Sequence, residues 1–288
     1  MQLMDFLESL PPIPLFLTTL GMGAVAATVI LVLVRAISRS LGVKSTDVIA
    51  IRDSLITSLS ALFAITVAFA SAGIWNDFVQ ARAAIQREAN ALENAFELSA
   101  GLPGGMRQEV QSEIVGVGHR ILEHDWPVMM HVVKVDQVLN EPSSVVRLIA
   151  RLSTRNPQGG LEPQANLLIG QLYDLRSARI QREIIARGGL SEAQWTALLA
   201  IASAALVLIA LSYNHDLGLR ITTASIYTVA ISSALYLVVA HQTPFAGYLA
   251  VQPTPIEQAL KRMQEELSKS KASDGTPVAR SGSEGGAR

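Results

Sequence analysis

The chain has 288 residues, of which 50% are hydrophobic and 16% are charged, and its net charge at neutral pH is −1. Soluble domains contain roughly 25% charged residues, so the composition excludes a simple soluble domain. The near-neutral net charge means that the chain lacks the excess of basic residues that is typical of nucleic-acid-binding proteins. The absence of cysteine excludes disulfides, thiolate nucleophiles and cysteine-based metal sites.

Four stretches of the chain contain no charged residue and no histidine. They cover residues 13–34, 54–76, 193–214 and 221–240. A helix needs about 20 apolar residues to cross roughly 30 Å of hydrocarbon, and each stretch is long enough. The sequence therefore predicts four transmembrane helices, with the last two forming a hairpin through the short segment 215–220.

The segment before the first span has the wrong charges for a signal peptide. Residues 1–12 contain two acidic side chains and no lysine or arginine, whereas a signal peptide begins with a basic region. We therefore expect the first span to be retained.

The second span is rich in serine, threonine, alanine and glycine, which suit close helix packing or a wet pore wall. Four of its residues recur at intervals of four and form what we call the span-two stripe: Thr57, Ala61, Ile65 and Phe69. Side chains at this spacing lie along one slowly winding line of a helix. Multiplied by rotational symmetry, such a line forms an apolar constriction that gates ions by dewetting. Periodicity alone favours the alternative, an ordinary helix–helix packing face.

The segment 77–192 separates the second span from the third and has a helical pattern of apolar residues, without the alternation typical of strands. The expected helices cover residues 77–100, 106–131, 142–154 and 163–187. The sequence GLPGG at 101–105 separates the first two. Ser191 and Gln194 predict a capping box that begins the third membrane helix.

The chain after the fourth span is expected to contain an extended strap, a short helix and a disordered tail. Residues 242–253 contain proline, glycine and aromatic residues without a helical period, and predict an extended strap. A short helix is expected from Pro255 to Leu267. The predicted domains are an N-terminal segment (1–12), a first pair of transmembrane helices (13–76), a helical domain (77–192), a second pair of transmembrane helices (193–241), a strap with a short helix (242–267) and a disordered tail (268–288).

Basic residues next to the spans predict the orientation. They are more numerous on the side of the 77–192 segment and the tail, and basic loops stay in the cytoplasm. The rule is weaker for a long insertion. We expect the large domain and both termini to be cytoplasmic.

Motifs for enzyme chemistry are missing from the sequence. There is no glycine-rich phosphate loop, no HExxH and no GxSxG, so we expect no enzyme and no cofactor. The spans carry no ionisable side chain of the kind that proton-coupled transporters need. His119 and Glu123 share a helix face, but a metal site needs three or four ligands, so no metal site is predicted.

Arginines at intervals of three occupy the last expected helix of the large domain. Arg176, Arg179 and Arg182 predict a solvated basic face. The alternatives are an anion-attracting vestibule, a salt-bridge surface between subunits and contact to lipid head groups.

Short motifs resemble the bacterial bestrophin-like domain family, and more distantly the bestrophins. They are WNDFVQAR at 75–82, REANAL at 87–92, HDWP at 124–127 and PFAG at 244–247. Their order relative to the four spans makes the resemblance specific. The residues that carry it are Trp75, Arg82, Arg87, Glu88, Asn90, Trp126, Pro127, Pro244, Phe245 and Gly247.

The resemblance implies an all-α membrane protein with four transmembrane helices and a helical cytoplasmic domain inserted between spans 2 and 3. Bestrophins are pentameric ion channels, so it also implies a homopentamer in the bacterial inner membrane that passes small inorganic ions. Aligned on Arg82, the hydrophobic neck of the family falls on the span-two stripe. We expect Pro244, Phe245 and Gly247 to pack against the helical body.

Two features limit what carries over from bestrophins. The acidic cluster that follows Pro-Phe-Gly in calcium-gated members is replaced here by residues 248–251, Tyr-Leu-Ala-Val, which implies no calcium clasp. An uncharged neck also leaves the sign of the ion open. The competing interpretation is a non-conducting membrane scaffold whose helical body docks a partner.

Overall fold

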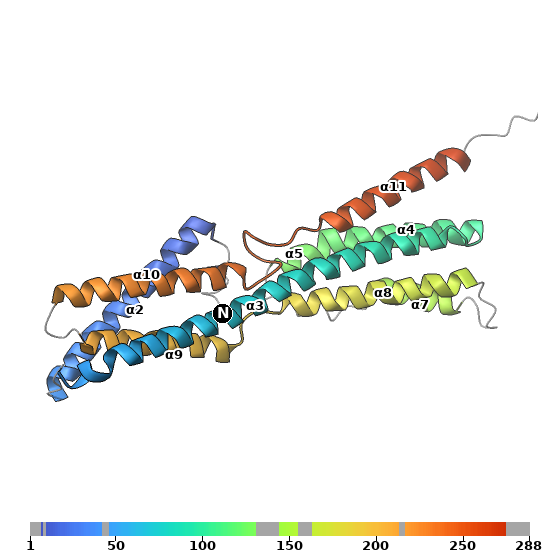
Figure 1. Cartoon of the computed structure of the whole chain (residues 1–288). Coiled ribbons are helices and arrows are strands. Elements are labelled where there is room, and N and C mark those ends of the chain that lie inside the picture. The colour runs from blue at the N-terminus through green and yellow to red at the C-terminus, as the bar shows by residue number, and fades with distance from the viewer. Residues whose placement is uncertain are drawn as a thin grey trace, which may run out of the picture. The chain divides into compact units, whose positions relative to one another are not determined.

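The computed structural model describes residues 7, 10–41, 46–130, 144–154, 163–212 and 217–274, and within these ranges it is helical without strands (Figure 1). The helices follow the chain in the order α2 (Pro12–Leu41), α3 (Thr46–Ser99), α4 (Gly104–Arg120), the π-helical turn η1 (Ile121–Asp125), α5 (Trp126–Met129), α7 (Ser144–Thr154), α8 (Pro163–Ala186), α9 (Glu192–Ser212), α10 (Leu217–His241) and α11 (Thr254–Asp274).

The chain forms two compact units. The first comprises Met1–Ala83, Val128–Val138 and Arg182–Gln252, and the second comprises Ala84–Pro127, Leu139–Gln181 and Pro253–Arg288. The boundary between Ala83 and Ala84 falls inside α3, so this helix contributes to both units. The boundaries that we predicted for the membrane and cytoplasmic domains stay predictions.

Four helices are long and apolar enough to cross a membrane, which agrees with the predicted number of spans. They are Pro12–Ser40, Ser54–Ser99, Glu192–Ser212 and Leu217–His241. In the first unit, α2, α9 and α10 pack on one another. The segment that joins the predicted hairpin lies partly outside the described residues, and its last residues, from Leu217, already belong to α10.

A glycine permits the close approach of α2 to α10. A Cβ atom placed on Gly23 would lie 2.2 Å from Ser232 Oγ and 3.5 Å from Ser232 Cβ. These distances leave no room for a larger side chain unless Ser232 moves. Small residues at such crossings let the backbones of membrane helices come together.

The third membrane helix begins at the predicted capping box. The backbone N–H of Ser191 donates to Gln194 Oε1 over 2.9 Å, and the backbone N–H of Gln194 donates to Ser191 Oγ over 3.3 Å. These two bonds satisfy backbone donors that a helix start leaves open. The prediction is confirmed, and α9 follows directly.

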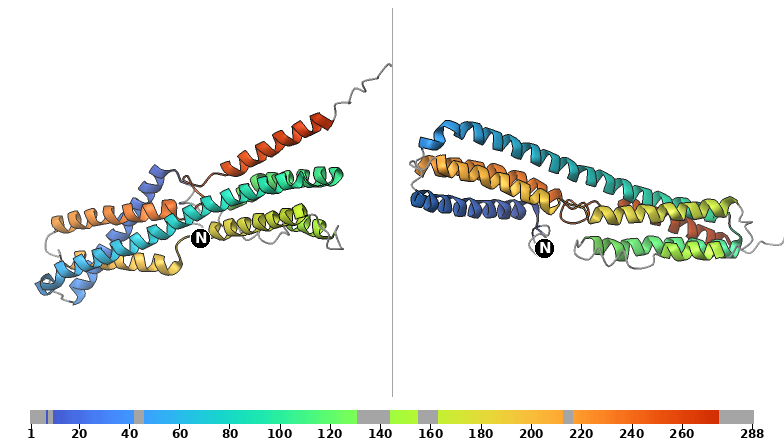
Figure 2. Two further views of the ribbon diagram at one scale, coloured as in Figure 1. Left: turned by 45° about the vertical axis from the view of Figure 1, so that its right-hand side comes forward. Right: turned by 90° about the horizontal axis from the view of Figure 1, so that it is seen from below.

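The second span and the first helix of the large domain are one helix. α3 runs for 54 residues without interruption, as the views of Figures 1 and 2 show. The segment 75–82 contains neither glycine nor proline, so nothing in it ends a helix. The predicted break at GLPGG is confirmed, because α3 ends at Ser99 and α4 begins at Gly104.

The predicted helix 106–131 is helical through Met129, but a π-helical turn interrupts it. α4 ends at Arg120, and a π-helical turn follows in which the backbone N–H of Trp126 donates to the carbonyl of Ile121. Pro127 explains the change, since proline has no N–H to donate and its ring clashes with the carbonyl four residues earlier. The turn widens there and the chain continues as α5.

The remaining helices lie close to their predicted positions, with one correction at the C-terminus. α7 and α8 match the expected helices 142–154 and 163–187. α11 continues to Asp274, so the expected end at Leu267 is wrong and the first part of the predicted disordered tail is helical. The rest of that tail lies outside the described residues.

Candidate functional site

One face of α3 is buried against the other membrane helices of the first unit. Phe63, Ala70 and Ile74 are buried there. Phe63 forms a core cluster with Leu198 of α9 and Ile231 of α10. The second span is therefore anchored to the bundle through this face.

The span-two stripe lies on the face of α3 that the chain leaves uncovered. All four of its residues are exposed, with 54% of Ile65 and 76% of Phe69 accessible against 9% of Phe63. A helix turns by about 100° per residue, so six positions place Phe63 about 120° from Phe69 around the axis. The structure brings the stripe together on one surface, and its role in a neck stays a prediction.

The surface beside the stripe is made of small and internally bonded side chains. Ala64, Ala68 and Ala72 are exposed at intervals of four. Ser58 Oγ donates to the carbonyl of Ser54 over 2.8 Å, and Thr66 Oγ1 donates to that of Leu62 over 2.8 Å. Because these hydroxyls bond to their own helix, this stretch of α3 offers a narrow, mainly apolar surface.

Most family-motif residues on α3 lie on its exposed side, and one lies on its buried side. Trp75, Arg82, Arg87 and Asn90 are exposed, whereas Glu88 is fully buried. Within the second unit, Arg87 Nη1 donates to Gln181 Oε1 of α8 over 2.6 Å. Arg87 thereby connects α3 to α8.

The other motif of the large domain lies at the π-helical turn. Trp126 is buried and Pro127 is exposed. Asp125, at the end of the turn, is buried and lies 3.1 Å from Arg179 Nη2 of α8. The motif thus lies at a turn whose buried carboxylate, Asp125, pairs with Arg179.

The strap that follows α10 is folded onto the first unit. Pro244 is buried and Phe245 is 2% exposed. The backbone N–H of Val251 donates to the carbonyl of Pro244 over 2.8 Å. Gly247 adopts a φ of 82°, a left-handed conformation that suits glycine.

Burial of Pro244 and Phe245 agrees with a docked strap, whereas Gly247 is exposed. A small hollow beside the strap is shared with Leu10 and Leu15 of the N-terminal region and Tyr236 of α10. The strap therefore docks beside membrane helices of the first unit, and its expected packing against the helical body stays a prediction.

Two of the three arginines predicted to form a solvated face are buried. Arg179 pairs with Asp125 as described, and Arg182 Nη1 lies 2.6 Å from Met129 Sδ within the first unit. A sequence signal for this burial exists. Leu168, Leu172 and Leu175 are buried at helical spacing, and the same spacing continues through Arg179 and Arg182.

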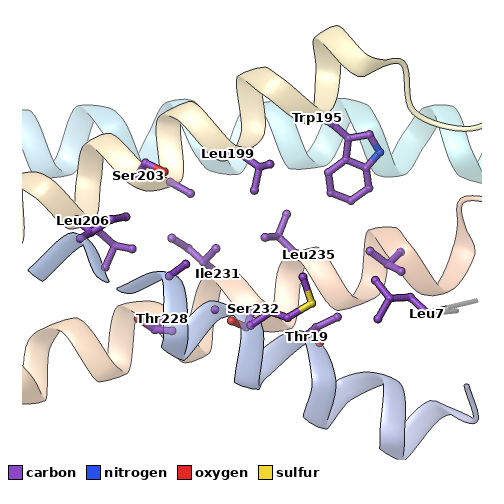
Figure 3. Close-up of a pocket in the computed structure, with 16 residues that line it drawn as sticks. Leu7, Thr19, Trp195, Leu199, Ser203, Leu206, Thr228, Ile231, Ser232 and Leu235 are labelled. Carbon is purple, nitrogen blue, oxygen red and sulfur yellow. The ribbon is translucent and has the colours of Figure 1, made fainter. Parts of the chain in front are cut away.

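An apolar cavity of about 420 Å³ lies between α2, α9 and α10 (Figure 3). Its wall includes Trp195 and Leu206 of α9, Ile231 of α10 and Met22 of α2. Among the lining residues that the structure describes, none is charged and none belongs to α3. The cavity is thus separate from the span-two stripe.

Metal-ligating side chains do not gather in the part of the chain that the structure describes. No group of three or more His, Cys, Asp or Glu residues is found there. His119 Nδ1 lies 3.2 Å from Glu123 Oε1, and its Nε2 lies 2.7 Å from Gln264 Nε2 of α11. The histidine contacts a carboxylate and an amide and helps to hold α11 beside α4.

Comparison with known proteins identifies the family. The model of the bestrophin-like domain matches residues 22–256. A solved structure of a bestrophin homologue from Klebsiella pneumoniae is 14% identical and covers 88% of this chain and 98% of its own, with a TM-score of 0.59. A single-substitution variant of that homologue is 15% identical over 89% of this chain and 98% of its own, with a TM-score of 0.59.

The comparison with curated proteins gave no match. The similarity to the Klebsiella structures shows a common fold, and the family model matches most of the sequence. The chain belongs to the bestrophin-like domain family.

Proposed function

We propose that this chain forms a cyclic homopentamer that conducts small inorganic ions through a hydrophobic neck lined by the span-two stripe. Characterised members of the bestrophin-like family and fold are ion channels. The assembly lies in the bacterial inner membrane, with the large helical domain and the termini in the cytoplasm.

The observation that carries this proposal is the two-faced character of α3. Phe63 is buried against α9 and α10, whereas Ile65 and Phe69 point away from the bundle and are exposed. In a closed ring each subunit needs one face for its own bundle and another face for the axis. The same stretch of α3 has a face that packs on its own bundle and a face that is left exposed.

The small residues beside the stripe support close approach of several copies of α3. Ala64, Ala68 and Ala72 form an exposed line next to Ile65 and Phe69. Small side chains let membrane helices pack with their backbones near one another. Copies of α3 packed through this line would turn the bulkier side chains toward a common axis.

The chemistry of the neck follows from its apolar rings. Five copies of Ile65 and Phe69 would form two stacked rings without charge. Such rings impose a dehydration barrier on ions without binding them. Ala61 and Thr57, one and two turns earlier than Ile65, would make the neck wider and more easily wetted.

Particle size and ion flux test this proposal together. Detergent-solubilised protein examined by mass photometry should be dominated by one species of five subunits, and the same preparation should mediate ion flux in liposomes. A dominant monomer or dimer without flux contradicts the channel and supports the scaffold interpretation.

The absence of cysteine allows an independent count of subunits. A cysteine placed at Phe69 would be the only thiol in each chain. A bifunctional thiol reagent should then produce a cross-linked ladder that ends at five chains. The same substitution at Phe63, which is buried within one subunit, should produce no ladder.

A further inference from the structure

α2 and α10 run in opposite directions through the first unit. Phe16 of α2 contacts Tyr236 of α10, with 5.4 Å between the ring centroids. Further along α2, Gly23 lies against Ser232, which precedes Tyr236 in the chain. The C-terminal end of α2 and the N-terminal end of α10 are therefore at the same end of the pair.

Three arginines gather at that end, and we call them the arginine cluster: Arg35 and Arg39 of α2 and Arg220 of α10. Arg35 and Arg220 are each twelve residues from the contact between Gly23 and Ser232, which is about 18 Å along a helix. The charges of Arg35 and Arg39 repel that of Arg220. Arg39 is exposed, Arg35 is half-buried and Arg220 is 6% exposed, so the cluster reaches from the surface into the bundle.

The guanidinium of Arg220 lacks hydrogen-bond partners. Its Nε and Nη1 atoms are buried, and no residue in the described part of the chain accepts a hydrogen bond from either of them. The first turn of α10 contains no acidic residue. A buried cation without a counterion is destabilising, and proteins normally pair such a charge. The surroundings of Arg220 therefore lack the anionic group that its charge requires.

The start of α10 adds to the positive potential around Arg220. Arg220 lies in the first turn of this helix, where unpaired N–H groups and the helix dipole attract anions and disfavour a cation. Arg39 lies in the last turn of α2, where a cation is favourable. A helix N-terminus, a buried guanidinium and two nearby arginines thus favour one anion at this end of the helix pair.

The position of the cluster along the spans indicates the class of anion. Arg35 directly follows the first uncharged stretch, 13–34, and Arg220 directly precedes the fourth, 221–240. Each stretch is long enough to cross the hydrocarbon core, so the cluster lies at the edge of that core, where lipid head groups begin. The planar fork of an arginine matches the oxygens of a phosphate group.

We infer that Arg35, Arg39 and Arg220 bind the phosphate of an anionic phospholipid, with Arg220 as the innermost contact and Arg39 as the outermost. The lipid would supply the acceptor oxygens that Nε and Nη1 of Arg220 lack, and its negative charge would offset the repulsion among the three arginines. The site lies within the first unit and does not require ion conduction, so it goes beyond the proposed channel function.

Thermal unfolding in a neutral detergent tests the site. Delipidated wild type and Arg220→Met, whose side chain has a similar length, are compared in detergent alone and with added phosphatidylglycerol or phosphatidylcholine. A ligand that binds only the folded state raises the melting temperature. Wild type should gain about 2 °C or more with phosphatidylglycerol relative to phosphatidylcholine, and Arg220→Met should lose this gain. Without lipid, Arg220→Met should melt no lower than wild type, because it removes an unpaired buried charge.

Native mass spectrometry measures the bound lipid directly. Arg220→Met should weaken the binding of phosphatidylglycerol by about tenfold, the value of a hydrogen bond to a charged group. Arg39→Gln changes an exposed residue and should fold normally, yet it should also weaken this binding. Arg120→Gln is the matched control, because it removes an exposed arginine of α4, which is not one of the membrane-spanning candidates. It should leave the binding and the melting temperatures unchanged.

Each outcome decides for or against the lipid site. Equal effects of phosphatidylglycerol on wild type and Arg220→Met would overturn the inference. An Arg220→Met variant that fails to fold, or melts lower than wild type without lipid, would also overturn it by showing that the guanidinium has a protein partner. If inorganic phosphate in lipid-free detergent raised the melting temperature as much as phosphatidylglycerol, the site would belong to a free anion. A loss of lipid binding at Arg220 and Arg39 that is absent at Arg120 supports the inference.

Discussion

Phe63 and Phe69 lie on different sides of the same helix, six residues apart, and only the first is covered by its own chain: 9% of Phe63 is exposed against 76% of Phe69. Two aromatic residues of one helix thus have different environments. Phe63 belongs to the core of the chain, and Phe69 is left uncovered by it. Phe63 is therefore the control position for substitutions at Phe69.

Truncation of Phe63 should destabilise the subunit without opening a pore. Phe63→Ala removes a ring that packs with Leu198 and Ile231, and large-to-small core substitutions of this kind cost about 3–5 kcal/mol. We expect a clearly lower melting temperature and a normal flux per assembled particle. A raised flux in Phe63→Ala would contradict its assignment to the core.

Truncation of Phe245 should loosen the strap. Phe245→Ala removes a side chain that is 2% exposed, so we expect a loss of a few kcal/mol at most, seen as a lower melting temperature. Tyr248→Ala, at a position that is 73% exposed, should leave the melting temperature unchanged. Equal effects at the two positions would argue against a docked strap.

A methyl group at Gly23 should strain the crossing of α2 and α10. In Gly23→Ala the new methyl group would meet Ser232 Oγ, and we expect a loss of about 1 kcal/mol or more from overpacking. Gly21→Ala is the control, since nothing lies within 4 Å of the Cβ position there.

The same crossing allows a rescue experiment. Ser232→Ala removes the hydroxyl, so the double variant Gly23→Ala, Ser232→Ala should recover much of the lost stability. A double-mutant cycle measures the coupling between two residues in contact. Strictly additive effects on the melting temperature would show that the two residues do not interfere.

Much of the fold could be predicted from the sequence because its signals are strong and local. The spans lack charge, GLPGG breaks a helix, and Ser191 with Gln194 caps one. The unbroken α3 was harder to foresee, because hydropathy ends the span at Asn76 although the backbone has no reason to stop there. The π-helical turn depends on how the chain accommodates Pro127.

The candidate site could be predicted only in part. Periodicity identifies the span-two stripe as one face of a helix, but it cannot tell which face the other spans cover. That distinction depends on the packing of Phe63 against α9 and α10. The charge of Arg179 and Arg182 predicts solvent exposure, whereas their burial follows from their place in line with the buried Leu168, Leu172 and Leu175.

A comparison of ion flux between wild type and two variants of α3 tests whether the span-two stripe lines an ion-conducting neck. Wild type, Phe63→Ala and the double variant Ile65→Ala, Phe69→Ala are reconstituted in liposomes at matched protein incorporation. Removal of bulk from apolar rings lowers the dehydration barrier, so we expect a higher flux in the double variant and a wild-type flux in Phe63→Ala. A well-folded double variant whose flux does not exceed that of wild type would contradict the assignment of the span-two stripe to an ion-conducting neck.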